Sequence, residues 1–150
     1  MFKRHIQTLY KYQVAALLNR RPEQVILDIG GGKECPFLPY INAPRTHLII
    51  ALDISEEELR HNRGLDHKVV ADAAARGLPF RDGLADLVVS RSVVEHLYDN
   101  AAFFANCART LRPGGVMLHA FPSRFAPFAL MNRALPNRLS RRLVGYLHPE

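Results

Sequence analysis

Five short runs of almost continuous apolar residues divide this 150-residue chain. They cover residues 24–29, 47–52, 68–71, 84–90 and 116–121. A strand that is apolar on both faces is typical of a buried parallel sheet, because helices cover both sides of such a sheet. The runs therefore predict an α/β fold with a Rossmann-like, open, mainly parallel twisted sheet flanked by helices.

Helical patterns lie between and before these runs. We expect helices at residues 55–62, 91–96 and 100–110. Ser55 is the expected N-cap of the first, because three glutamates follow it and favour the positive end of the helix dipole. Residues 1–21 place apolar side chains three or four positions apart, which predicts an amphipathic helix that ends before Pro22. In a sheet of this kind, ligands bind beyond the carboxyl ends of the strands.

Gly30, Gly31 and Gly32 follow the first predicted strand, which carries Asp28 near its end. Glycine allows a positive φ and a close approach of a ligand to the backbone, although a tight loop without a ligand would also use it. A dinucleotide fingerprint would have its third glycine where Cys35 stands, and a phosphate-binding loop would need a Gly-Lys-Ser or Gly-Lys-Thr sequence. This disfavours a nucleotide-dependent oxidoreductase, and the turn favours a cationic or zwitterionic ligand.

Asp53 ends the second predicted strand. An aspartate at such a position is often only a helix cap, but Ser55 already supplies a cap here. Asp53 is therefore a candidate to accept hydrogen bonds from the two hydroxyls of a ribose.

Five stretches in this order resemble the class I S-adenosylmethionine-dependent methyltransferases, in particular the small-molecule branch of the ubiquinone and menaquinone biosynthesis methyltransferases. They are residues 27–32, 51–55, 71–73 with 78–80, 85–90 through 95–97, and 111–115. One departure is Glu34, which stands where that family commonly has a third glycine. The resemblance implies S-adenosylmethionine as the cofactor and methyl transfer to a small-molecule acceptor as the reaction.

The resemblance also implies roles for single residues. The methionine end of the cofactor is expected at Asp28 and the glycine turn, and Asp53 is expected to hold the ribose. Around the adenine the resemblance places Ile54, Asp72 and Ala73, and at the methionine and sulfonium it places Ser90 and Arg91. His96 is the candidate general base, with capping or a backbone contact as the alternative role. The seven histidines lack the spacing of metal ligands, so no metal site is predicted.

Residues 124–150 lack the hairpin with which the family's sheet normally continues. The chain is therefore expected to be shortened, either as a naturally shorter gene product or as a truncated piece. The fifth strand would then form an exposed edge, covered by the C-terminal segment or by a second copy of the chain. Predicted helices at residues 125–131 and 138–147 make this a basic segment that either caps the sheet or contacts an acidic membrane surface. The alternative to an enzyme is a catalytically silent cofactor-binding domain or fragment that acts as a partner subunit.

The chain thus divides into an N-terminal amphipathic helix (1–21), a cofactor-binding core (22–123) and the basic C-terminal segment (124–150). The net charge of +6 lies in the two end segments, whereas the core is mildly acidic, which disfavours nucleic-acid binding. Two cysteines, Cys35 and Cys107, suggest neither a disulfide framework nor a zinc cluster. The N-terminus lacks the pattern of a secretory signal and no run reaches membrane-spanning length, so we expect a soluble, cytoplasmic protein.

Overall fold

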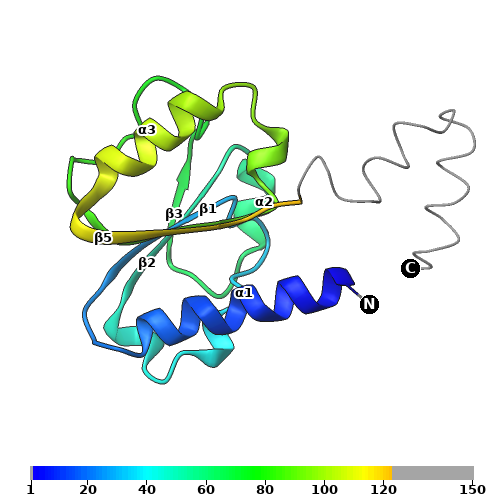
Figure 1. Cartoon of the computed structure of the whole chain (residues 1–150), viewed down its shortest axis with the longest axis vertical. Coiled ribbons are helices and arrows are strands. Elements are labelled where there is room, and N and C mark those ends of the chain that lie inside the picture. Colours follow the sequence, from blue (N-terminus) through cyan, green and yellow to red (C-terminus); the bar gives the residue numbers. More distant parts are fainter. Residues whose placement is uncertain (1, 123–150) are drawn as a thin grey trace, which may run out of the picture.

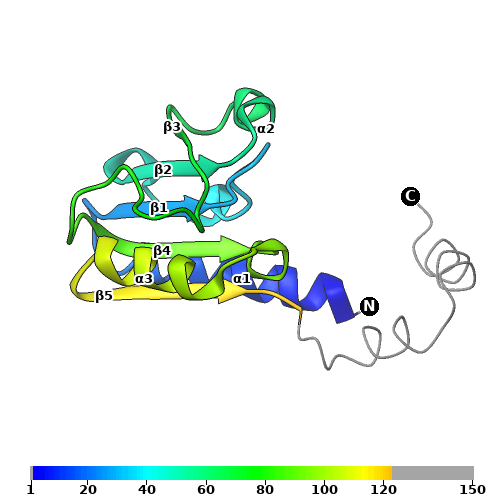
Figure 2. The same ribbon diagram turned by 90° about the horizontal axis from the view of Figure 1, so that it is seen from above.

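The computed structural model describes the backbone of residues 2–122 and the side chains of residues 8–122. Five strands form one sheet in the order β3-β2-β1-β4-β5, and every neighbouring pair is parallel. The strands are β1 (Val25–Ile29), β2 (Leu48–Asp53), β3 (His67–Val70), β4 (Ala85–Arg91) and β5 (Leu111–Ala120). Figure 2 shows β1, β2, β4 and β5 pointing in one direction. The predicted open, parallel Rossmann-like sheet is confirmed.

The register of the strands brings the predicted site residues to one edge. Ile29, the last residue of β1, lies opposite Leu52 of β2 on one side and opposite Ser90 of β4 on the other. Asp53, at the end of β2, lies opposite Val70 of β3. We call this the carboxyl edge of the sheet, and the opposite end, where the strands begin, the amino edge.

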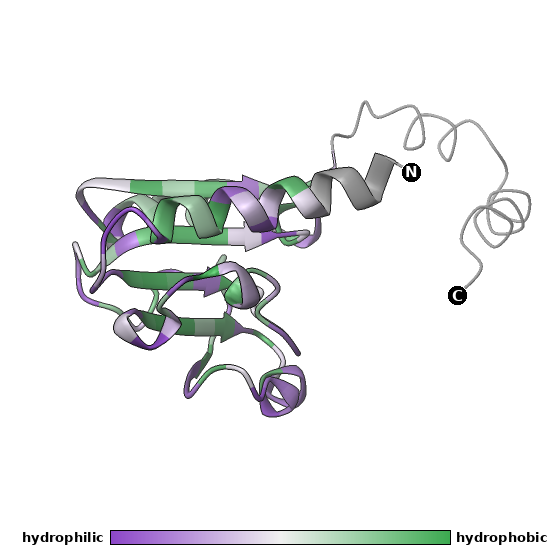
Figure 3. Cartoon of the chain, turned by 90° about the horizontal axis from the view of Figure 1, so that it is seen from below, coloured by the Kyte–Doolittle hydropathy of each residue, from purple (hydrophilic) through white to green (hydrophobic). Residues whose placement is uncertain are grey.

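Helices cover both faces of the sheet (Figure 1). They are α1 (Phe2–Leu18), α2 (Glu56–His61) and α3 (Asn100–Thr110), with short 3-10 helices η1 (Leu38–Tyr40), η2 (Pro44–Thr46) and η3 (Val94–His96). On one face Tyr10, Val14 and Leu18 of α1 join the core over β1, β2 and β4. On the other face Phe103 and Cys107 of α3 pack on a second core cluster. The strands between them are strongly hydrophobic, as Figure 3 shows.

Two elements differ from the sequence prediction. The helix expected at residues 91–96 is only the 3-10 turn η3, preceded by Ser92 with a φ of +57°, a value that an α-helix excludes. Strand β5 begins at Leu111, not at residue 116, because Leu111 pairs with Ala85 immediately after α3 ends. Residues 112–115, with Gly114 at a φ of +77°, then bulge opposite Asp86 before Val116 pairs with Leu87.

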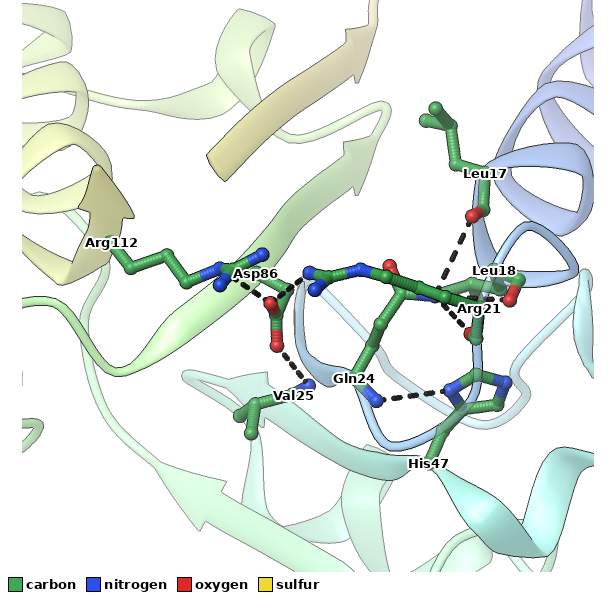
Figure 4. Close-up of polar contacts among 8 residues, drawn as sticks. All are labelled: Leu17, Leu18, Arg21, Gln24, Val25, His47, Asp86 and Arg112. Atoms are coloured by element: carbon green, nitrogen blue, oxygen red, sulfur yellow. Dashed lines mark hydrogen bonds and ion pairs between the residues drawn. The ribbon is translucent and has the colours of Figure 1, made fainter. Parts of the chain in front are cut away.

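Asp86 organises the amino edge (Figure 4). One of its carboxylate oxygens forms ion pairs with the guanidinium groups of Arg21 and Arg112, and the other accepts a hydrogen bond from the backbone N–H of Val25 at 2.7 Å. The side-chain amide of Gln24 donates to the carbonyls of Leu18 and Arg21 at 3.0 and 2.8 Å. These contacts fix the end of α1 against the starts of β1, β4 and β5.

Strand β5 forms one border of the sheet as far as residues 2–122 are concerned, since it pairs only with β4. The two helices predicted at residues 125–131 and 138–147 lie outside the described residues. Among the helices that the structure does describe, none combines the length and apolar character needed to cross a membrane.

Candidate functional site

The backbone of the glycine turn is fixed by β2 and α2. The N–H groups of Gly30 and Gly31 both donate to the carbonyl of Leu52, at 2.7 and 3.2 Å. The carbonyl of Gly31 accepts a hydrogen bond from the buried side-chain amide of Asn62, at the end of α2, at 3.1 Å. The turn is therefore held in place before any ligand arrives.

Two of the three glycines are required by the packing of the protein itself. Gly30 has a φ of +74°, and a Cβ at this position would overlap Cγ2 of Val93 in the loop after β4. A Cβ on Gly31 would lie 2.8 Å from the Cβ of Ala51 in β2. The reading of the turn as a tight loop thus accounts for Gly30 and Gly31. At Gly32 a Cβ would make only ordinary contacts, at 3.7 Å or more, with Asp53 and Glu58, but its φ of +35° is a backbone conformation that residues with a side chain rarely adopt.

Asp53 connects the end of β2 to the glycine turn. Its Oδ2 accepts from the backbone N–H of Gly32 at 3.1 Å, and its Oδ1 accepts from that of Ser55 at 2.9 Å. Ser55 caps α2 as predicted, because its Oγ accepts from the N–H of Glu58 at 3.2 Å. A carboxylate has about four acceptor positions, so Asp53 can accept two further hydrogen bonds. The next residue, Ile54, leaves 71% of its apolar side chain exposed.

Asp28 is a buried acid without a full set of donors. It is 4% exposed, and its Oδ2 has no hydrogen-bond partner within the described part of the chain. Burial raises its pKa to about 7, with a smaller effect of Arg91 in the opposite direction. The hydroxyl of Tyr10, on α1, is also buried and has no partner among the described side chains, those of residues 8–122, and burial followed by the charge of Asp28 raises the pKa of this tyrosine. These two atoms could accept hydrogen bonds from a cation.

Ser90 and Arg91 end β4, and their side chains go in different directions. The Oγ of Ser90 lies 2.8 Å from Nδ1 of His119 on β5, next to the ring of Phe103. Burial lowers the pKa of His119, so the imidazole is neutral at pH 7. Arg91 lies 3.9 Å from Glu34 across an ion pair, with its Nη2 toward the Oε1 of the glutamate. His119 thus contacts Ser90, a predicted site residue, from the neighbouring strand.

Asp72 follows β3, in a loop that α3 holds in place. Its Oδ1 accepts from the N–H of Ala74 at 2.8 Å, and its Oδ2 accepts from the hydroxyl of Tyr98 at 3.0 Å. The side-chain amide of Asn106 donates to the carbonyls of Ala73 and Ala75 at 3.0 and 2.8 Å. Ala73 itself is 7% exposed.

The structure brings most of the predicted residues to the carboxyl edge but does not gather them at one point. Gly32 and Asp53 are in direct contact. Asp28 lies on the α1 face of the sheet, whereas Ser90 lies on the α3 face, because side chains alternate along each strand. His96 lies in η3, with its side chain exposed and its backbone N–H bonded to the carbonyl of Val93 at 2.9 Å. Among the described residues no three His, Cys, Asp or Glu side chains converge as a metal site would require.

Sequence reasoning did not find three polar residues that shape this edge, namely Asn62, Tyr98 and Asn106. Each reaches its partner across 31, 26 or 33 positions of chain. The only local signal was that Asn62 and Asn106 are polar residues at positions where a helix buries its side chains. Such a signal indicates a buried hydrogen bond, but it does not name the partner.

Known proteins resemble this chain over the part that forms the sheet. A family model described as a methyltransferase domain matches residues 27–119, more than half of the chain. A probable S-adenosylmethionine-dependent methyltransferase of Mycolicibacterium smegmatis is 40% identical over 82 residues, which are 53% of this chain and 32% of that protein. A ubiquinone/menaquinone biosynthesis C-methyltransferase of Acidiphilium cryptum is 30% identical over 119 residues, 73% of this chain and 47% of that protein.

The fold is also found in solved structures. The crystal structure of an S-adenosylmethionine-dependent methyltransferase from Mesorhizobium loti superposes with a TM-score of 0.57 at 24% identity, and the match covers 73% of this chain and 52% of the other. This likeness concerns the fold. The chain spans about a third to a half of the length of the two sequence relatives named above.

Proposed function

The chain belongs to the methyltransferase-domain family, whose cofactor is S-adenosylmethionine, and from this premise we propose that its carboxyl edge binds this cofactor for methyl transfer to a small-molecule acceptor. One observation carries the proposal. A buried carboxylate oxygen, Oδ2 of Asp28, lacks a donor within the described residues and lies at the end of the strand that leads into the glycine turn.

The residues present fit the charged end of this cofactor. An ammonium group offers three donors and no acceptor, and Asp28 Oδ2 and the Tyr10 hydroxyl are two buried atoms that can accept. A buried anion without a partner is costly, so a bound cation would stabilise the ionised form of Asp28. Asp28 and the glycine turn are therefore assigned to the methionine end.

The remaining parts of the edge suit the nucleoside. Asp53 retains acceptor positions for two ribose hydroxyls while it holds Gly32 and Ser55. The exposed side chain of Ile54 offers an apolar surface for the adenine ring. Asp72 and Ala73 are assigned to the side of the adenine that carries its amino group. Burial of an aromatic ring against an exposed apolar side chain is favourable because it removes both surfaces from water.

When bound, S-adenosylmethionine supplies a methyl group activated by its sulfonium sulfur. The protein's own task is then to hold the acceptor in line with that group, since alignment supplies much of the acceleration. We assign Ser90 and Arg91, which border the carboxyl edge at the end of β4, to the methionine and sulfonium side. An O–H or N–H acceptor must also lose a proton, and the exposed His96 in the loop after β4 is the proposed general base.

Calorimetry with S-adenosylhomocysteine and with NAD tests cofactor binding. We expect S-adenosylhomocysteine to bind and NAD not to bind. An Asp53→Ala substitution should weaken the binding of S-adenosylhomocysteine by about a hundredfold, because two hydrogen bonds to a charged group are lost. Asp66→Ala, a change of the same kind at an exposed position before β3, is the matched control and should leave affinity unchanged. Failure of S-adenosylhomocysteine to bind the unmodified protein would refute the proposal.

Methyl transfer is tested separately with labelled S-adenosylmethionine and a metabolite extract. Labelled small-molecule product that disappears in Asp53→Ala would support an enzyme. Binding of S-adenosylhomocysteine without transfer to any acceptor in the extract would favour the alternative, a cofactor-binding partner subunit. His96→Gln should lower the transfer rate without changing the affinity for S-adenosylhomocysteine if His96 acts as the base.

A further inference from the structure

We propose that Tyr98 is a positioning residue for Asp72, which it orients so that the carboxylate accepts the adenine amino group and the site selects adenine over a base with a carbonyl at that position. This inference rests on the proposed function, because it concerns the same carboxyl edge. The observation behind it is the hydrogen bond of 3.0 Å between the Tyr98 hydroxyl and Oδ2 of Asp72.

The hydrogen bond joins two loops that follow strands which are not neighbours in the sheet. Asp72 follows β3 and Tyr98 follows η3 after β4, and in the sheet the strands β2 and β1 lie between β3 and β4. Those two intervening strands carry Asp53 and the glycine turn. The contact between Tyr98 and Asp72 thus links the loops on either side of the proposed cofactor site.

The position of Tyr98 argues against a role in the core. Its side chain is 75% exposed, an unusual place for an aromatic ring whose only function is packing. The hydrogen bond to Asp72 is the largest cause of a raised pKa for Tyr98, so the hydroxyl stays protonated and remains a donor at neutral pH. Tyr98 therefore acts on the carboxylate and not on the hydrophobic core.

The Asp72 carboxylate accepts a hydrogen bond at each oxygen and can still accept further hydrogen bonds. Oδ1 accepts from the Ala74 N–H at 2.8 Å and Oδ2 accepts from Tyr98, which together fix the plane of the group. About two of its four acceptor positions remain, enough for an amino group. A base with a carbonyl in place of the amino group would bring one acceptor against another, which costs affinity.

The loop that carries Asp72 does not depend on Tyr98. Asn106 donates to the carbonyls of Ala73 and Ala75, and Arg109 donates to those of Leu78 and Phe80 at 2.9 and 2.7 Å. Removal of the Tyr98 hydroxyl should therefore free the rotation of the carboxylate and leave the loop in place. This makes Tyr98→Phe a specific probe of orientation.

The test compares two ligands that differ at one group of the base. Calorimetry measures the affinity of the unmodified protein and of Tyr98→Phe for S-adenosylhomocysteine and for S-inosylhomocysteine, in which a carbonyl replaces the amino group. We expect Tyr98→Phe to weaken S-adenosylhomocysteine binding about five- to tenfold and to leave S-inosylhomocysteine binding within twofold. Tyr12→Phe, at an exposed tyrosine of α1, is the matched control and should change neither affinity.

A double-mutant cycle separates positioning from a general contact. In an Asp72→Asn background, the further change Tyr98→Phe should have no effect on the affinity for S-adenosylhomocysteine. Equal weakening of both ligands by Tyr98→Phe, or no weakening of either, would overturn the inference while leaving the proposed cofactor in place. Absence of S-adenosylhomocysteine binding to the unmodified protein would overturn the proposed function itself.

Discussion

Two aspartates with little solvent exposure, at opposite ends of the same sheet, have opposite surroundings. The side chain of Asp86, at the amino edge, is 10% exposed, meets two guanidinium groups and accepts the Val25 N–H. Asp28, at the carboxyl edge, is 4% exposed and has one oxygen without a donor among the described residues. Asp86 has its counter-charges within the chain, whereas Asp28 lacks one. This contrast is consistent with a stabilising role for the amino edge and supports our proposal that the carboxyl edge binds a charged ligand.

The largest effect is expected at the amino edge. Asp86→Ala should lower the free energy of unfolding by about 3 kcal/mol, because it leaves two guanidinium groups and a backbone N–H without their shared acceptor. Urea denaturation measures the loss. The control is Asp82→Ala, at a pair between the exposed Asp82 and Arg109, for which we expect a change below about 1 kcal/mol. Equal losses at the two positions would remove the distinction between the amino edge and the surface.

At the carboxyl edge the effect on stability should have the opposite sign. Burial raises the pKa of Asp28 from 3.8 to about 7, so the folded protein holds this proton more tightly than the unfolded chain does. The stabilisation is complete below pH 4 and is lost as the pH rises through 7. Asp28→Asn should therefore raise the free energy of unfolding at pH 8 by about 1–2 kcal/mol relative to the unmodified protein, and should have no such benefit at pH 4.

The same substitution should weaken S-adenosylhomocysteine binding, because a neutral amide cannot form an ion pair with the ligand's ammonium group. In the unmodified protein the affinity should increase between pH 6 and 8, as Asp28 becomes ionised. Urea denaturation at pH 4 and pH 8, and calorimetric titrations at pH 6 and pH 8, measure these effects. If the variant and the unmodified protein have the same difference in free energy of unfolding at pH 4 and at pH 8, the pKa of Asp28 is not raised as we infer.

Arg21 and Arg112, at the amino edge, should each be able to neutralise Asp86 when the other is removed. We expect Arg21→Ala and Arg112→Ala each to cost about 1 kcal/mol of unfolding free energy, since each is partly exposed and the other still neutralises Asp86. The double variant should lose more than the sum of the two, because the mostly covered carboxylate of Asp86 then has no cation beside it. Strictly additive losses in urea denaturation would contradict this account of a shared counter-charge.

The smallest effect on stability is expected at Ile54, which is 71% exposed at the carboxyl edge. Ile54→Ser should change the free energy of unfolding by less than about 0.5 kcal/mol but weaken S-adenosylhomocysteine binding about three- to tenfold. Leu9→Ser, at an apolar side chain of α1 that is 55% exposed, is the matched control. If both variants bind the ligand normally, the apolar surface for adenine does not include Ile54.

Much of the fold could be predicted because its signals are local. Each apolar run marked a strand to within about one residue at four of five positions, and the cap of α2 at Ser55 was read from the glutamates that follow it. The start of β5 could not be predicted, because the chain enters the sheet at Leu111 to pair with Ala85 and place Arg112 beside Asp86. That pairing outweighs the turn propensity of residues 112–115.

The sequence by itself determined the parallel sheet, the glycine turn and the acids at or just after the ends of β1, β2 and β3, because hydrophobic periodicity and turn residues act over a few neighbouring positions. Only the tertiary structure decided which acid is neutralised and which is not. Asp86 pairs with Arg21, 65 positions away, and Asp72 pairs with Tyr98, 26 positions away, whereas Oδ2 of Asp28 has no donor among the side chains that the structure describes, those of residues 8–122. Charge balance and burial depend on neighbours in space, which residue order alone does not specify.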